Sequence, residues 1–331
     1  MTTPSSAANS SHLPDVSVIL PILNEELYLR DSITSILSQD YLGKFEVILA
    51  VGPSHDRTLE IARDLAREDK RVVVIENPTG RTAAGLNLAL AASVSEYVIR
   101  VDGHSEIPRN YISLAIEILQ RTGAVNVGGV MAAVGVTPFE VAVAGAMRSP
   151  LGVGASRFHT GGEAGVVDTV YLGAFKRQAL VAIGGFDERF TRAQDWELNF
   201  RLRENGGVIY FDPRLEVTYR PRPNLRALAK QYFEYGRWRR VVSRRHTGTI
   251  NYRYLAPPVA LLGFVASLIL GFVSPIFFIP AAIYLAFVLA STLVIARNLR
   301  STLYLIAIIP TMHFAWGAGF ITSPRSIVPI G

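Results

Sequence analysis

Cysteine is absent from this chain of 331 residues, which excludes disulfides and any chemistry that needs a thiol. Charged side chains are scarce, at 18% against 50% hydrophobic residues, and most of them lie in the first three quarters of the chain. This distribution predicts a soluble part followed by an apolar tail. Residues 1–14 are rich in Ser, Thr and Ala but lack the apolar core of a signal peptide, so they are predicted to form a disordered leader.

The tail contains a long stretch without charge. No charged side chain occurs from Tyr254 to Ala296, and a helix of this length would extend roughly 65 Å, about twice the hydrocarbon thickness of a bilayer. Ser274 and Pro275 lie near its middle, where proline favours a break. The stretch therefore predicts two membrane spans, near residues 255–273 and 276–296.

A third apolar run, residues 302–322, contains His313 as its one ionisable group, which is tolerable where the side chain faces neighbouring helices. Residues 254–331 are therefore predicted to form a bundle of about three transmembrane helices. The alternative is a helical hairpin buried in a soluble domain, but such helices rarely stay apolar on all faces over this length.

The formal charge of +6 is unevenly distributed, because six arginines gather just before the first predicted span. They are Arg237, Arg239, Arg240, Arg244, Arg245 and Arg253. Positive loops stay on the cytoplasmic side, and Arg297 and Arg300 in the next inside loop agree. The pattern predicts a multi-pass protein of the inner (cytoplasmic) membrane with its amino-terminal domain in the cytosol. Residues 225–253 are predicted to form a basic interfacial helix along the lipid headgroups, with an ordinary surface helix as the alternative.

Before the tail, short β-branched runs alternate with helical patterns. Strands are predicted at residues 16–21, 45–51, 72–76 and 97–102, and helices at 27–39, 58–70 and 82–92. This alternation predicts an α/β domain over residues 15–224, with a Rossmann-like, mostly parallel sheet and ligands at the carboxyl ends of its strands. Beyond residue 124 the pattern weakens, and strand-like pieces remain at 125–130, 167–175 and 208–211.

The sequence Asp102-Gly103-His104 closes the fourth predicted strand, where side chains project into the ligand crevice. Asp102 and His104 are potential metal ligands. A divalent cation held by them could bridge two phosphates and neutralise the charge that develops on a departing diphosphate. Imidazole beside carboxylate favours Mn²⁺, and Mg²⁺ is the other candidate. An Asx-turn in an ordinary loop is the structural alternative.

Asp195 begins a helical pattern that runs to Asn205. A carboxylate at this position could act as the general base that accepts the proton of an attacking hydroxyl. An acid in the first turn also stabilises a helix by itself, so helix capping is the structural alternative. Glu188 and Glu197 are lesser candidates for the base.

Two further turns could contact a nucleotide. Arg81 precedes a helix start rich in small residues and could reach a phosphate there, or the turn could serve only to connect a strand to a helix. The segment from Pro21 through Asn24 and Glu25 could line a base pocket or start a helix.

In this order, the motifs resemble the inverting family 2 glycosyltransferases of the GT-A fold over about residues 15–245. The matching pieces are the opening motif from Ser17 through Glu25, the turn from Ser54 to Thr58, Asp102 with His104 at the D-x-D position, and Gln194 with Asp195 at the E-D position. The resemblance implies site roles as follows: donor binding by Pro21, Asn24, Glu25, Asp56, Arg81 and Asp102; metal binding by Asp102 and His104; acceptor or diphosphate contact by Gln194, Trp196, Arg237 and Trp238; and catalysis by Asp195.

The Arg81 turn and the apolar tail resemble the branch that includes succinoglycan-type exopolysaccharide transferases. That branch implies transfer of a hexose from a nucleotide sugar, with UDP-sugar favoured, to a polyprenyl-diphosphate-linked saccharide at the cytoplasmic face of the membrane. Three departures stand out: Val51 and Gly52 replace acidic residues, His104 replaces the second aspartate, and Gln194 replaces a glutamate. The sequence Tyr235-Gly236-Arg237-Trp238 resembles the R-W element of processive polysaccharide synthases, but only three spans follow it, which favours single addition over processive synthesis.

Other functions remain open from the residues alone. A non-catalytic, nucleotide-sugar-binding membrane subunit is compatible with Val51, Gly52 and His104. A nucleotidyltransferase would need a longer glycine-rich loop near the first strand. A nucleic-acid partner is not expected despite a pI near 9.6, because anionic membrane lipids explain arginines beside an apolar segment. The sugar, the nucleotide and the linkage depend on loops between about residues 131 and 165.

Overall fold

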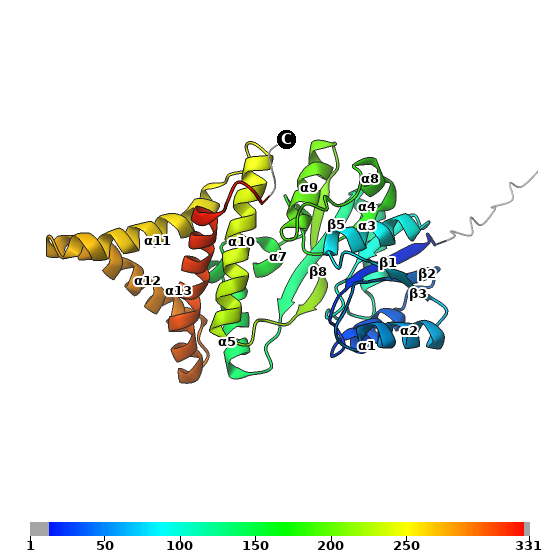
Figure 1. Ribbon diagram of the computed structural model, residues 1–331, viewed down its shortest axis with the longest axis horizontal. Helices are drawn as coiled ribbons and strands as arrows, with labels where there is room; N and C mark the ends of the chain where they lie inside the picture. Colours follow the sequence, from blue (N-terminus) through cyan, green and yellow to red (C-terminus); the bar gives the residue numbers. More distant parts are fainter. Residues whose placement is uncertain (1–12, 328–331) are drawn as a thin grey trace, which may run out of the picture.

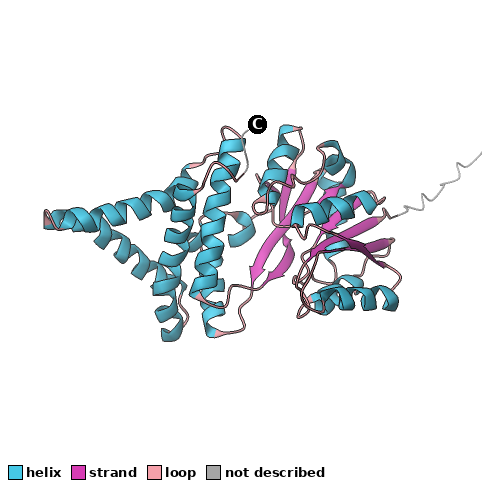
Figure 2. Ribbon diagram, viewed as in Figure 1, coloured by secondary structure: helices cyan, strands magenta, loops and turns pink. Residues whose placement is uncertain are grey.

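The computed structural model describes residues 13–327, so all but the last two residues of the predicted leader lie outside the described part. A sheet with its covering helices forms one half of the molecule, and long helices alone form the other half (Figure 2). The strands are β1 (Val16–Ile22), β2 (Phe45–Val51), β3 (Val72–Glu76), β4 (Tyr97–Arg100), β5 (Asn126–Ala133), β6 (Gly165–Val166), β7 (Ala174–Lys176) and β8 (Ile209–Tyr219).

The shorter helices are α1 (Leu29–Leu37), α2 (Thr58–Glu68), α3 (Thr82–Ala92), α4 (Tyr111–Thr122), α5 (Pro138–Met147), α6 (Pro150–Val153), α7 (Arg157–Thr160), α8 (Arg177–Ala182) and α9 (Gln194–Glu204). The long helices that follow are α10 (Leu225–Arg245), α11 (Tyr252–Gly271), α12 (Ile279–Ile295) and α13 (Leu299–Thr322), with a short 3₁₀ turn, Pro275–Phe278, between α11 and α12.

The strands of residues 13–327 form one sheet in the order β3-β2-β1-β4-β7-β5-β8-β6. The first four strands are parallel, and β5 pairs in parallel with β8. β7 runs antiparallel between β4 and β5, and β6 runs antiparallel to β8. The predicted mostly parallel α/β sheet is therefore present.

Alternating side chains bury both faces of this sheet. Along β1, Val18 and Leu20 belong to one core cluster, which α1, α2 and α4 complete, while Ile19 belongs to a second cluster with α3, α8 and α9. Successive side chains of a strand point to opposite faces, so a strand covered on both sides must be apolar throughout. The continuous apolar runs that predicted the strands follow from this double burial.

The predicted strand at 167–175 is wrong as a single element. The chain forms β6 before it and β7 at its end, because Leu172 and Gly173 adopt φ of 57° and 115°, values that break an extended strand. A Cβ at Gly173 would lie 2.5 Å from the Asn126 side chain, so glycine is needed at this close approach. The piece at 208–211 is the start of the much longer β8.

The helix α10 packs directly against α13, and the two lie side by side in the middle of the molecule (Figure 1). A Cβ on Gly236 would lie 1.9 Å from the Trp316 carbonyl oxygen, and one on Gly319 would lie 1.9 Å from that of Phe233. Glycines on both helices thus let their backbones touch. The basic segment predicted at 225–253 therefore has one side packed against the apolar region, and its position at lipid headgroups stays a prediction.

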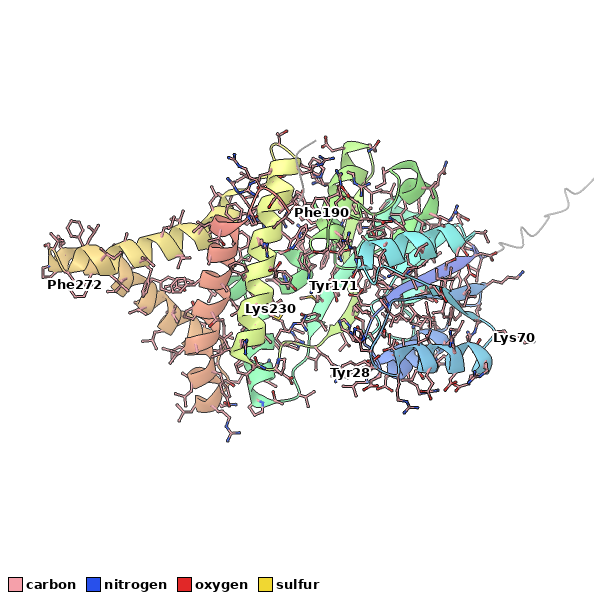
Figure 3. All side chains as sticks on the ribbon, viewed as in Figure 1. Tyr28, Lys70, Tyr171, Phe190, Lys230 and Phe272 are labelled. Carbon is pink, nitrogen blue, oxygen red and sulfur yellow. The ribbon has the colours of Figure 1, made fainter. Side chains whose placement is uncertain are left out.

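Within the described residues, three helical segments are long and apolar enough to cross a membrane: Tyr252–Gly271, Pro275–Ile295 and Leu299–Thr322. The three helices that the sequence predicted are present, and the break falls at Pro275 as expected. α11 and α12 form a hairpin that projects from the body, with Phe272 near its tip at 88% exposure (Figure 3). Such apolar exposure is typical of a surface that meets lipid.

Candidate active site

The loops that follow β1, β2, β3 and β4 meet at one edge of the sheet. A Cβ on Gly52, after β2, would lie 2.9 Å from the Cα of Gly80, after β3, and 3.1 Å from Leu23, after β1. A Cβ on Gly103, after β4, would lie 3.1 Å from the Glu25 side chain. The predicted motifs therefore converge at the carboxyl ends of the parallel strands, where α/β sheets bind ligands.

Arg100 joins the two predicted acidic groups of this edge. It is the last residue of β4 and is only 3% exposed. Its Nη2 donates to Asp102 Oδ1 over 3.0 Å, and its Nη1 donates to Asp195 Oδ1. Because Asp102 lies two residues beyond Arg100, both side chains leave the chain on the same side. The structure thus brings Asp102 and Asp195 to one buried guanidinium.

The two carboxyls differ in proton affinity. Burial raises the pKa of Asp195 to about 6, and the charge of Arg100 offsets only part of this effect. Burial acts on Asp102 in the same direction, but the charges of Arg100 and His104 outweigh it and hold the pKa of Asp102 below its usual value. Asp102 is therefore an anion at neutral pH, while Asp195 has the higher proton affinity that suits a base near pH 7.

His104 lies beside Glu25 at the same edge. Its Nδ1 is 2.8 Å from Glu25 Oε1, and this hydrogen bond raises the pKa of His104 despite the opposing effect of burial. The bond also fixes the orientation of the ring, as a second carboxylate does for many metal-bound histidines. Glu25, predicted as a donor contact, therefore holds His104 in place.

The donor set at Asp102 and His104 fits a divalent cation in part. Asp102 Oδ2 and His104 Nε2 have no hydrogen-bond partner in the part of the chain that the structure describes. Carboxylate oxygen and imidazole nitrogen suit Mn²⁺ or Mg²⁺. No three His, Asp or Glu side chains within residues 13–327 form a metal site by themselves, so a cation there needs further ligands, which the phosphates of a substrate can supply.

Asn24 and Asp56 connect the first two loops. The His55 backbone N–H donates to Asn24 Oδ1 over 2.9 Å, and the Glu26 backbone N–H donates to Asp56 Oδ2 over 3.2 Å. The backbone N–H of Thr58 donates to the other oxygen of Asp56 over 3.0 Å. These bonds show that both side chains shape the edge of the crevice, and their direct contact with a donor stays a prediction.

Arg81 directly precedes α3, and Pro21 of β1 packs against the first turn of this helix. Arg81 is exposed, directly precedes the helix, and its guanidinium makes no hydrogen bond with other described residues. An anion near it would also meet the positive end of the helix dipole. Pro21 lies in β1, where a Cβ on Gly85 of α3 would come within 3.2 Å of it. This close packing brings the helix start toward the strand ends.

The start of α9 positions Asp195. Ala193 precedes the helix with φ of 57°, a left-handed conformation that costs a residue with a Cβ roughly 1–2 kcal/mol. Gln194 and Asp195 follow at the first turn, half-buried. Backbone strain of this kind is characteristic of functional sites. Here it turns the chain so that Asp195 meets Arg100.

The lesser candidates for the base are engaged elsewhere. Glu197 is 1% exposed and accepts hydrogen bonds from Arg201 over 2.7 and 2.8 Å. Glu188 accepts a hydrogen bond from Asn87 over 2.9 Å. Neither contacts Arg100 in the structure, so Asp195 is the better placed of the three carboxylates.

Of the predicted acceptor contacts, Trp238 lies in α10 and is 5% exposed. Its ring is 5.8 Å from that of Phe190, and its Nε1 donates to Glu234 over 3.2 Å. Arg237 pairs with the same glutamate at 3.2 Å. Trp196 is 8% exposed in the same cluster. Contact of Arg237 and Trp238 with an acceptor stays a prediction.

Three arginines near the site were missed by the sequence reasoning. Arg192 contributes to the lowered pKa of Asp102, and Arg222 opposes the rise in the pKa of His104, so both lie close to the acidic edge. Both are in loops without a recognisable pattern. Arg100 could have been found from the sequence, because it is a charged residue in an otherwise apolar strand.

The comparison with known proteins identifies the family. Residues 17–184 match the family described as Glycosyl transferase family 2. The chain is 33% identical over 308 residues to the succinoglycan biosynthesis protein ExoA of Rhizobium meliloti, covering 92% of this chain and 93% of that protein. The chain belongs to glycosyltransferase family 2.

This family 2 glycosyltransferase has further relatives in sequence and fold. It is 24% identical to a dolichyl N-acetyl-alpha-D-glucosaminyl phosphate 3-beta-D-2,3-diacetamido-2,3-dideoxy-beta-D-glucuronosyltransferase of Methanococcus voltae, covering 88% of this chain and 90% of that protein. The mannosyltransferase PcManGT of Pyrobaculum calidifontis, solved with GDP-Man and Mn²⁺, superposes with a TM-score of 0.63 at 21% identity, covering 95% and 88% of the two chains. TarS residues 1–349 of S. aureus, solved with UDP, superpose with a TM-score of 0.52 at 17% identity, covering 92% of this chain and 90% of that chain. These likenesses confirm the GT-A-like fold.

Proposed function

We propose that this glycosyltransferase is an inverting enzyme that moves a hexose from a nucleotide-diphosphate sugar to a polyprenyl-diphosphate-linked saccharide in exopolysaccharide synthesis. The observation that carries the proposal is the Asp102–Arg100–Asp195 arrangement at the strand ends. The similarity to ExoA along nearly the whole chain supports the exopolysaccharide role. The name of the Methanococcus voltae relative, which includes a dolichyl-linked sugar phosphate, supports a lipid-linked acceptor.

The reaction we propose uses one base and no enzyme nucleophile. The acceptor hydroxyl oxygen forms a bond to the anomeric carbon while the bond from that carbon to the diphosphate oxygen breaks. The leaving nucleoside diphosphate takes the electron pair, and Asp195 accepts the hydroxyl proton. A single displacement of this kind inverts the anomeric configuration, because attack and departure occur on opposite faces.

Cationic groups would stabilise the leaving diphosphate. Asp102 and His104 would hold a divalent cation, which when bound neutralises charge on the diphosphate. Arg81 at the start of α3 would contact the phosphates directly. Arg192 and Arg222 add positive charge around Asp102 and His104. Together these groups favour departure of the diphosphate.

For the placement of the enzyme, we propose the inner membrane, with the sheet domain in the cytosol and three helices crossing the bilayer. The arginines of α10 before α11, and Arg297 and Arg300 between α12 and α13, support this orientation. The acceptor would then be reached at the cytoplasmic leaflet, where a lipid-linked saccharide is anchored by its own apolar chain.

A donor screen with the purified full chain in lipid nanodiscs tests the function. UDP- and GDP-sugars are supplied with polyprenyl-diphosphate-linked saccharides, with Mn²⁺, with Mg²⁺, or with a chelator. We expect one donor to transfer sugar, and we expect the chelator to lower the rate by at least about tenfold, because cation stabilisation of the leaving group is worth several kcal/mol. Manganese-dependent nucleotide binding without transfer or donor hydrolysis would instead indicate a non-catalytic subunit.

The pH dependence of transfer should reflect Asp195. The base works only as a carboxylate, and burial raises the pKa of Asp195 to about 6. We therefore expect kcat/KM to be constant above this value and to fall as the pH drops below about 6, by about tenfold per pH unit once Asp195 is mostly protonated. Initial rates measured from about pH 4.5 to about pH 8, a range that brackets the pKa of Asp195, would check this expectation. A flat profile through pH 5 would contradict the assignment.

A further inference from the structure

A cavity of about 560 Å³ lies between α9 and the segment that connects α10 to α11. This volume is typical of small-molecule sites. Its lining residues are Asp168, Trp196, Phe200, Arg203, Glu204, Thr247, Gly248, Thr249, Ile250, Asn251, Tyr252 and Tyr254. One of the lining residues, Trp196, directly follows Asp195 in α9.

The most unusual group beside this cavity is the guanidinium of Arg239, from α10. It lies 4.2 Å from the ring centroid of Trp196 and 4.2 Å from that of Tyr254, so it is held between two lining residues. Its Nη1 is buried and has no hydrogen-bond partner in the described chain. Burial lowers the pKa of Arg239 to about 10, which leaves the side chain charged at neutral pH. A buried cation without a hydrogen-bonded anion is costly unless an anion binds to it.

Asp168 and Glu197 near the cavity are partnered, whereas the lining residue Glu204 is exposed and forms no salt bridge with another described residue. Asp168 pairs with Arg203 at 3.7 Å. Glu197, behind the lining, accepts from Arg201 and lies 3.2 Å from His246. Arg239, between the lining residues Trp196 and Tyr254, has no such partner among the described residues, and its planar group can donate two parallel hydrogen bonds to a phosphate.

The cavity also lies where the chain enters its apolar region. Tyr252 and Tyr254 belong to the first turn of α11, the first candidate membrane span. Tyr252 is 81% exposed and Ile250 is 46% exposed, so apolar surface borders the cavity on the membrane side. α9 and α10 stand next to each other in Figure 1, with α11 leaving from the top of α10. A ligand here could keep its polar end in the cavity and its apolar chain along α11.

Sugar stacking explains the cavity less well. Trp196 is the aromatic that a sugar ring would need, but Arg239 lies over it at 4.2 Å and Phe200 stacks with it at 5.8 Å and 13°. Its ring is therefore already covered by these two neighbours.

We propose that this cavity binds the phosphate groups of the polyprenyl-linked acceptor, with Arg239 as the phosphate ligand. The proposal rests on the proposed function for the identity of the acceptor. It places the phosphates beside Trp196 and the saccharide toward Asp195, so that a hydroxyl of the saccharide reaches the base.

Binding in nanodiscs tests the cavity without any need for catalysis. The full chain is placed in phosphatidylcholine nanodiscs that contain a long-chain polyprenyl phosphate, the matching polyprenol, or phosphatidylglycerol, and retention of each lipid is measured. We expect the parent to retain the polyprenyl phosphate far better than the polyprenol. We expect Arg239→Gln to weaken that retention by about tenfold or more, since the change removes a charged hydrogen-bond donor to the phosphate.

The matched control is Arg240→Gln, because Arg240 lies on the same helix but over the Phe320 ring, whereas Arg239 lies over the lining residues Trp196 and Tyr254. We expect its retention to equal that of the parent. A second variant, Thr247→Trp, fills the cavity from an exposed lining position and leaves Arg239 in place; it should weaken retention as well. Equal retention by Arg239→Gln and Arg240→Gln would overturn the proposal, as would equal retention of phosphatidylglycerol by the parent, which would indicate an ordinary lipid-headgroup site.

Kinetics separate this proposal from the proposed function. In Arg239→Gln we expect KM for the lipid-linked acceptor to rise by about tenfold, while donor hydrolysis without acceptor keeps the parental rate. If the parent transfers sugar but Arg239→Gln keeps the parental acceptor KM, the cavity assignment is wrong and the function stands. If the parent binds polyprenyl phosphate through Arg239 but neither transfers nor hydrolyses any donor, the function is wrong and the cavity stands.

Discussion

Asp195→Asn should lower the transfer rate by roughly 10³-fold while leaving donor binding near the parental value. The amide keeps the shape of the side chain and can still meet Arg100, but it cannot accept the hydroxyl proton, and a general base typically contributes 10²–10⁴ in rate. Single-turnover transfer with saturating donor measures the chemical step, and nucleotide binding by calorimetry measures the donor site separately.

The matched control for this change is Glu188→Gln. Glu188 is a nearby carboxylate that accepts from Asn87 and does not contact Arg100, so its neutral amide should transfer sugar at the parental rate. If Asp195→Asn retained the parental rate, or if Glu188→Gln lost activity to the same extent, the base would have to be assigned elsewhere.

The early part of the fold was predictable because local and tertiary constraints agree there. Strands β1, β2 and β4 contribute side chains to both core clusters, so their sequences are mostly apolar, and the predicted bounds of β1 to β4 match within two residues. The break at Pro275 was predictable for a similar reason, since proline cannot donate to a preceding turn. The middle of the chain was harder, because β7 is inserted antiparallel between β4 and β5, a pairing that no local pattern encodes.

The candidate site was predictable in its acidic residues but not in how they are connected. Asp102, His104 and Asp195 occur in motifs with a recognisable order. Arg100 was available as a signal, because one charge in the apolar strand Tyr97–Arg100 has to find a buried partner. Which partner it finds depends on the placement of α9, and this placement arises from tertiary packing. Arg239 was visible only as one of several arginines, and its place between Trp196 and Tyr254 needs three separate elements.

Arg100→Met should both destabilise the protein and shift the pH dependence of kcat/KM for sugar transfer. The apolar side chain fills similar space but leaves Asp102 and Asp195 without their shared cation. Removing one partner of a fully buried ion pair costs roughly 3–5 kcal/mol. Since these carboxylates are 20% and 25% exposed, we expect about 2–3 kcal/mol, measured as a lower unfolding temperature in nanodiscs. Arg30→Met is the matched control, because its pair with Glu68 is half-exposed and should contribute less than about 1 kcal/mol.

The same change separates a structural arginine from one that tunes the base. Arg100 lowers the pKa of Asp195 against the effect of burial, so its removal should move the acid limb of kcat/KM to higher pH than in the parent. Arg100→Lys keeps a charge that reaches fewer carboxylate oxygens and should give an intermediate limb and unfolding temperature. In the double variant with Asp195→Asn, part of the lost stability should return, since one unpaired carboxylate is gone. An unmoved acid limb in Arg100→Met would mean that this guanidinium supports the fold alone and that burial by itself sets the proton affinity of the base.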